Sequence, residues 1–297
     1  MFKVKFWGVR GSIPCPGPKT AKYGGNTSCL QIKTDLDYQI IIDAGTGIRS
    51  LAADLLSDPE IKKPLKIYLF LTHTHWDHIM GFPFFTPIYI PDSEITIFGP
   101  VTFEDEPLEK VVGGQLTYKY FPLRKDELRS KIVYQNLKEG NMRLPGDLVV
   151  SYKYLNHPIL CLGYRFEYKN KKFCTCYDHE PFQNLFKGDI LNEEEGELAA
   201  NDNNSRITAF FRNADLLVHD AQYTSIEYKK YIGWGHSTYK YAISQAMKGN
   251  VNRLALFHHD PERTDEQLDE VKGTFKQKYS SDKIDIFPAY EKLEIEL

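Results

Sequence analysis

Short apolar runs with the two-residue period of β-strands alternate along the chain with segments that have the spacing of amphipathic helices. Residues 1–8 alternate and then meet glycine and proline, so we expect a first strand there and not a signal peptide. Residues 65–71 form an apolar run with β-branched and aromatic side chains, which predicts a strand buried on both faces. Further strands are expected at 28–34, 38–42, 148–156, 163–168, 172–177, 216–219 and 253–257.

Helical spacing is found between these strands, at 46–57, 204–213, 238–248 and 265–278. Both halves of the chain are rich in strands and close with helices. This order predicts an α/β fold with two sheets and helices outside them, a four-layer αββα sandwich formed by one domain, 1–297. Residues 101–136 and 180–205 fit the pattern poorly, and we expect surface excursions there of the kind that shape access to a site.

The composition narrows the class of protein. The chain is 42% hydrophobic and 26% charged, with a formal net charge of −3. This charge gives no sign of a nucleic-acid partner, and no apolar stretch approaches the ~20 residues that span a bilayer. Five scattered cysteines indicate free thiols in a reducing compartment. We expect a cytoplasmic protein with a small-molecule substrate, no membrane and no nucleic acid, and leave a homodimer open.

The strongest chemical signal follows the buried run 65–71. Three histidines and one aspartate lie within six residues: His73, His75, Asp77 and His78. Residues two apart on an extended backbone project to the same side, so the first two imidazoles leave the chain together. Imidazole nitrogen and carboxylate oxygen are suitable zinc ligands. The motif therefore predicts a metal site at the end of a strand.

Other strand ends carry further candidates. His157 and Asp178 each follow a predicted strand, and His258 directly follows 253–257 with His259 as its neighbour. Because ligand sites gather at the carboxyl ends of strands in α/β sheets, these side chains are expected near the first motif. Together they supply enough ligands for two ions. The last ligand is His258 or His259, and we favour His258.

With these residues, the chain resembles the metallo-β-lactamase superfamily over nearly its whole length. The pattern His73-x-His75-x-Asp77-His78 is the specific part of the resemblance, and Gly235-His236-Ser237-Thr238 is similar to a motif of the phosphodiesterase branch. That branch includes the tRNA 3′-processing endonucleases and the phosphoribosyl cyclic phosphodiesterases. The start of the chain, 6–14 with 23–28, resembles the same branch.

The resemblance implies a dinuclear site that uses zinc, with manganese or iron as alternatives. One ion would be bound by His73, His75, His157 and Asp178, and the other by Asp77, His78, Asp178 and His258. Asp43 is similar to an early aspartate that supports the ligand loop. His219 and Asp220 end a predicted strand close to the site, and we expect the same supporting role from them.

The implied reaction is hydrolysis of a phosphodiester, in a small or cyclic nucleotide-like substrate, by a hydroxide held between the two ions. Asp77 would orient that hydroxide. His236 would contact the phosphate or protonate the leaving oxygen, unless it is only the neighbour of a helix cap. The chain lacks a basic, glycine-rich insertion like the arm that grips tRNA in the endonucleases. A di-iron oxygen-binding or redox sensor protein and an RNA nuclease are the alternatives.

Overall fold

The computed structural model describes residues 1–101, 106–189, 191–279 and 284–297. Within these residues the strands form two sheets of seven strands each. The first has the order β14-β1-β2-β3-β4-β5-β6 and the second β13-β12-β11-β10-β9-β8-β7. The strands are β1 (Phe2–Gly8), β2 (Cys29–Thr34), β3 (Gln39–Ile42), β4 (Lys66–Phe70), β5 (Glu94–Pro100), β6 (Lys131–Leu137), β7 (Gly140–Leu144), β8 (Leu148–Leu155), β9 (Cys161–Tyr168), β10 (Lys171–Cys176), β11 (Leu216–Asp220), β12 (Arg253–Phe257), β13 (Asp285–Pro288) and β14 (Glu294–Glu296).

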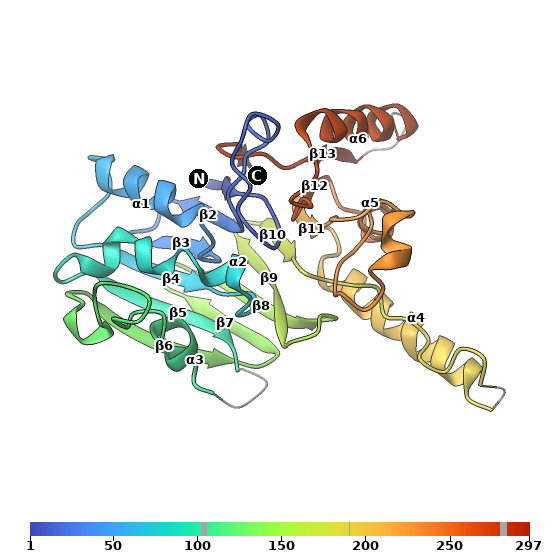
Figure 1. The fold of residues 1–297 in the computed structure, drawn as a ribbon, viewed down its shortest axis with the longest axis horizontal. Helices are drawn as coiled ribbons and strands as arrows, with labels where there is room; N and C mark the ends of the chain where they lie inside the picture. Colours follow the sequence, from blue (N-terminus) through green and yellow to red (C-terminus); the bar gives the residue numbers. More distant parts are fainter. Residues whose placement is uncertain (102–105, 190, 280–283) are drawn as a thin grey trace.

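Helices cover the outer face of each sheet. The α-helices of the described chain are α1 (Ile48–Ser57), α2 (Trp76–Ile79), α3 (Leu108–Gly113), α4 (Glu193–Phe210), α5 (Tyr239–Lys248) and α6 (Asp265–Lys278), with short 3-10 turns η1 (Phe82–Phe84), η2 (Thr86–Tyr89), η3 (Lys125–Glu127) and η4 (Glu227–Lys230). Figure 1 shows α1, α2 and α3 beside the first sheet and α4, α5 and α6 beside the second. The predicted four-layer αββα arrangement is confirmed.

Three apolar layers hold the four structural layers together. Alternate residues of the strands point inward, so Val4, Phe70 and Phe166 belong to a core between the two sheets. The opposite face of the first sheet packs with Leu51 and Leu55 of α1. The opposite face of the second sheet packs with helix residues such as Ile207, Ile243 and Phe275. Each sheet therefore buries both faces, so the ends of its strands are the places where polar side chains can form an accessible site.

Strand direction brings the candidate residues to one edge. In the first sheet β3, β4, β5 and β6 are parallel, and in the second β10, β11, β12 and β13 are parallel. β8 runs antiparallel to β9, which runs antiparallel to β10, so β8 has the direction of β10. The carboxyl ends of β8, β10, β11 and β12 consequently open at the same edge of the second sheet.

The structure differs from the sequence-based expectations in the two poorly fitting segments, and it contains four further strands that were not expected: β5, β7, β13 and β14. The helix expected at 204–213 begins eleven residues earlier, because α4 starts at Glu193 and its acidic first turn suits the positive end of the helix dipole. Its N-terminal part projects away from the sheets (Figure 1). Residues 131–136 belong to the edge strand β6 and not to a loop, and 102–105 lie outside the described residues. None of the described helices has the length and apolar character of a membrane span.

Candidate metal centre

Every candidate ligand follows the carboxyl end of a strand. His73, His75, Asp77 and His78 follow β4 of the first sheet, and the other three come from the second sheet. His157 follows β8, Asp178 follows β10, and His258 follows β12. The site is therefore assembled from both sheets, at the edge where their parallel strands end.

Left-handed backbone turns the side chains toward one another. Asp43, Asp178 and His258 have φ angles of 60°, 44° and 60°. A non-glycine residue in this region is uncommon and costs on the order of 1–3 kcal/mol, so its surroundings must hold it there. All three lie just beyond a strand, where the change in φ bends the chain out of the sheet. Other residues of the chain also have positive φ angles, but these three combine that backbone with side chains that point into one cluster.

The structure brings the seven predicted ligands into two overlapping groups. Within each group the potential ligand atoms all lie within 4.8 Å of one another. The first group contains His73, His75, His157 and Asp178, and the second contains Asp77, His78, Asp178 and His258. They have the same members as the two sets that the resemblance implied.

Asp178 is shared between the two groups. Its Oδ2 atom lies 3.5 Å from His73 Nε2 and 3.4 Å from His78 Nε2, while its Oδ1 atom lies 3.4 Å from His258 Nε2. The carboxylate is 1% exposed. Oδ2 therefore faces members of both groups, and Oδ1 faces a member of the second group. A carboxylate that bridges two ions would occupy such a position.

Unpaired polar atoms test whether cations fit this site. His73 Nε2, His78 Nε2 and Asp178 Oδ1 are buried without a hydrogen-bond partner. Buried polar atoms are normally paired, so three orphaned atoms in one cluster need an explanation. All three are metal-ligand atoms and all belong to the two groups described above. The donor set therefore fits two cations.

The electrostatics of the cluster also fit cations. Burial lowers the pKa of His73 well below its usual range and the pKa of His157 to about 4, so both imidazoles are neutral and free to bind a metal. Burial also disfavours the charged form of His258, but Asp178 and Asp77 raise its pKa to about 9. The two carboxylates stabilise positive charge on His258, so the cluster favours a positive charge at this position. A bound cation would supply that charge.

Asp43 is hydrogen-bonded to the loop that carries the first four candidate ligands. Its Oδ1 atom accepts a hydrogen bond from the backbone N–H of Thr72 at 2.7 Å, and its Oδ2 atom accepts one from His78 Nδ1 at 2.7 Å. Ser28 Oγ donates to the same Oδ2 atom at 3.1 Å. Because His78 carries its proton on Nδ1, its Nε2 atom is left as the acceptor that faces the cluster.

Two more candidate ligands are oriented in the same way. His157 Nδ1 donates to the backbone oxygen of Gly235 at 3.0 Å, and His258 Nδ1 donates to Gln222 Oε1 at 2.9 Å. Both histidines consequently present Nε2 to the cluster. Fixed tautomers of this kind are what metal-binding histidines require.

His236 lies beside the cluster and pairs with Asp220. Its Nδ1 atom donates to Asp220 Oδ2 at 2.7 Å, and the backbone N–H of Ser237 donates to Asp220 Oδ1 at 2.8 Å. Its ring centroid is 4.9 Å from that of His258 and 5.5 Å from that of His157. His236 thus lies between ligands of the two groups, in contact with both. Asp178, Asp220, His236 and His258 form a third group of potential ligands, so the geometry leaves a ligand role for His236 open.

Two histidines that the sequence placed near the site lie elsewhere. His219 belongs to the face of the second sheet that packs against helices, where its ring lies near His179 and Tyr241. Its side chain contacts none of the seven ligands in the described hydrogen bonds and ring contacts. His259 Nε2 donates to the backbone oxygen of Ala289 at 2.8 Å. Of the two rivals, His258 is the one that lies in the cluster.

The N-terminal loop contributes residues to which sequence reasoning gave no role. The backbone N–H of Ser12 donates to Asp77 Oδ2 at 2.7 Å. A Cβ atom on Gly11 would lie 2.3 Å from His258 Cε1, so only glycine fits beside this imidazole. Both residues lie in the segment 6–14, which resembles the phosphodiesterase branch. The role of Gly11 could not be predicted from the sequence, because it depends on the position of the His258 ring.

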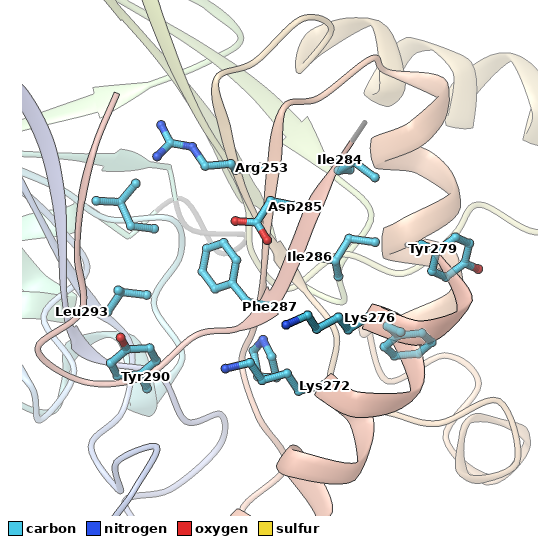
Figure 2. Close-up of a pocket in the computed structure, with 13 residues that line it drawn as sticks. Arg253, Lys272, Lys276, Tyr279, Ile284, Asp285, Ile286, Phe287, Tyr290 and Leu293 are labelled. Atoms are coloured by element: carbon cyan, nitrogen blue, oxygen red, sulfur yellow. The ribbon is translucent and has the colours of Figure 1, made fainter. Parts of the chain in front are cut away.

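A large cavity elsewhere is not part of this site. It has a volume of about 690 Å³ and lies between α6 and β13, as Figure 2 shows. Lys272, Lys276 and Phe287 are among its lining residues, and none of the seven ligands is.

Comparison with known proteins places the chain in a family. The family model of the metallo-beta-lactamase superfamily matches residues 23–150. A ribonuclease Z from Lactococcus lactis is 30% identical, over 66% of this chain and 72% of that protein. One from Listeria monocytogenes is 27% identical, over 75% and 81%. The crystal structure of the short form of human tRNase Z has 19% sequence identity and a TM-score of 0.63, and the alignment covers 99% of this chain and 98% of that one.

The chain belongs to the metallo-β-lactamase superfamily and is a metal-dependent hydrolase of that superfamily. The expectation that nucleic acid is not a partner is wrong, because the similar proteins are ribonucleases. That expectation rested on the net charge of −3. Net charge averages over the whole surface, whereas two divalent cations would dominate the field at the site itself.

Proposed function

We propose that the protein hydrolyses phosphodiester bonds with two divalent cations. The observation that carries the proposal is the pair of overlapping ligand groups around Asp178, with His236 lying against both of them. Two adjacent metal positions suit in-line displacement at phosphorus, because one side of the site faces the attacking oxygen and the other faces the leaving oxygen.

The first group, with three imidazoles and one carboxylate, would hold one ion, and the second, with two of each, would hold the other. Nitrogen and oxygen donors in this proportion favour zinc, and manganese and iron accept the same ligands. When bound, two such ions lower the pKa of water and neutralise charge that develops on the phosphoryl oxygens. Asp77 Oδ2 lies 3.1 Å from His258 Nε2 and 3.3 Å from His78 Nε2, which places this carboxylate in the second group, where it would also orient the attacking water.

His236 is the candidate proton donor to the leaving oxygen. Asp220 accepts from Nδ1, so the histidine is held in one orientation. Asp220 is itself fully buried and held by the N–H of Ser237. This pair of residues resembles the His–Asp portion of a catalytic triad in its physical logic, in which the carboxylate orients the imidazole that moves the proton.

RNA is the substrate class that we favour. The support comes from the relatives named ribonuclease Z, which are similar over most of their own length. A small or cyclic diester, the substrate expected from the sequence, stays a prediction. The di-iron redox alternative has no specific support from the arrangement of the site.

A substrate panel tests the proposal. We expect the metal-loaded protein to hydrolyse bis(p-nitrophenyl) phosphate faster than p-nitrophenyl phosphate, and to cleave a short RNA. A preference for the monoester or for a thioester would contradict phosphodiester hydrolysis. Cleavage of the small diester without cleavage of any RNA, including an unprocessed tRNA, would contradict the RNA assignment alone.

A further inference from the structure

Glu180 is a buried carboxylate to which the reaction proposed above gives no role. It lies two residues after Asp178 and is 5% exposed. It has no salt bridge to a cationic side chain among the described residues. Burying an ionised carboxylate is costly unless hydrogen bonds satisfy it, so its position needs a reason.

That reason lies in the loop before His236. Glu180 Oε1 accepts from the backbone N–H of Gly233 at 2.8 Å, and Oε2 accepts from the N–H of Gly235 at 2.8 Å. The two glycines have φ angles of 87° and 85°. Left-handed glycines that point two N–H groups at one anion form a small anion-binding cradle, and here the anion is a side chain of the same protein.

The same loop is tied to a metal ligand. The carbonyl oxygen of Gly235 accepts from His157 Nδ1 at 3.0 Å, and a Cβ atom on Gly235 would lie 2.2 Å from that nitrogen. The backbone N–H of Glu180 donates to the carbonyl of Asn156 at 2.9 Å. Glu180 therefore connects three segments, which carry the bridging carboxylate, the histidine ligand after β8, and His236.

We propose that Glu180 is a positioning residue, which fixes the Gly233–Gly235 loop and thereby places His236 for proton transfer to the leaving oxygen. It acts through backbone N–H groups and does not touch substrate. The inference rests on the proposed hydrolysis with His236 as proton donor.

The substitution Glu180→Gln is the sharpest perturbation. Glutamine keeps the size and shape of glutamate but replaces one acceptor oxygen with an NH₂ donor. An amide nitrogen at the Oε1 position faces the Gly233 N–H, and one at the Oε2 position faces the N–H groups of both glycines, so a donor opposes a donor in either orientation. Tyr228→Phe is the matched control, because the Tyr228 hydroxyl donates to the same Glu180 Oε1 atom at 2.6 Å and its removal leaves both glycine contacts in place.

The readout is turnover on two diesters that differ in leaving group, with metal content measured in parallel. Nitrophenolate departs without a proton, whereas the alkoxide released from a dinucleotide needs one. A positioned general acid contributes ~10²–10⁴-fold, so Glu180→Gln should slow dinucleotide cleavage by about tenfold or more and change bis(p-nitrophenyl) phosphate turnover far less. Tyr228→Phe should lower neither rate by a comparable amount.

A double variant tests whether the effect passes through His236. If it does, adding Glu180→Gln to His236→Ala causes no further loss on the dinucleotide, because the group being positioned is already absent. Multiplicative losses, an equal loss on both diesters, or no loss on either would overturn the role of Glu180 while leaving the proposed hydrolysis intact. A wild-type protein inactive on both diesters would overturn the proposed function, and this inference with it.

Discussion

The support that Asp43 gives to the ligand loop predicts a selective metal-binding defect in Asp43→Asn. The wild-type carboxylate accepts from the Thr72 N–H through one oxygen and from His78 Nδ1 through the other, both at 2.7 Å. Asparagine offers one acceptor oxygen and one NH₂ group. Either the Thr72 N–H loses its acceptor, or His78 must move its proton to Nε2, the atom that faces the cluster.

The size of the effect follows from this conflict. Changing the outer partner of a metal-binding histidine typically costs ~10–100-fold in metal affinity. This corresponds to about 1.4–2.8 kcal/mol. The loss of affinity should fall mainly on the ion bound by the second group, because His78 belongs to that group. The first group, which contains His75 and His157, does not include His78.

Competition titration with a chelating indicator measures the two affinities. Asp37→Asn is a suitable control, since Asp37 is exposed and pairs only with Lys62 in the described contacts. We expect wild-type affinities in the control and one weakened site in Asp43→Asn. Two unchanged sites in a folded Asp43→Asn protein would refute the argument that Asp43 sets the tautomer of His78.

Three further variants test the arrangement of the site. Asp178→Ala should lose more metal than any single histidine variant, because its carboxylate serves both groups; elemental analysis that finds both ions retained would contradict the bridge. His236→Ala should keep both ions while alkoxide-leaving turnover falls by ~10²–10⁴-fold; loss of one ion would make His236 a ligand. Gly11→Ala should weaken the second ion, since its Cβ atom would lie 2.3 Å from the His258 ring, whereas Gly17→Ala, with no atom within 4 Å, serves as its control; equal affinities in the two variants would show that the close approach is unimportant.

The fold could be predicted to the level of its layers. Alternating apolar positions located most of the central strands within a few residues, because a buried face must keep the two-residue period. The pattern missed the central strand β5 although Ile95 and Ile97 are buried, and it also failed at two elements where that constraint is weak. β6 is an edge strand with exposed positions, and the early turns of α4 bury few side chains, so neither carries a clear hydrophobic period.

The candidate ligands could be predicted because strand ends and residue chemistry coincide. Four candidate ligands, three histidines and one aspartate, in six residues after a buried strand leave few alternatives. The supporting residues could not be found in the same way. Glu180 acts on backbone N–H groups, and Gly11 acts by lacking a side chain, so neither role has a sequence pattern. His219 shows the converse error, since a histidine at a strand end faces the site only if the strand's alternation directs it there.

The direct test of two-metal phosphodiester hydrolysis is a titration of metal-free protein with zinc, manganese or iron while hydrolysis of bis(p-nitrophenyl) phosphate is followed. The account predicts that at least one of these metals gives activity that reaches its plateau at two ions per chain. A plateau at one ion, or no diester hydrolysis after two ions have bound, would contradict it.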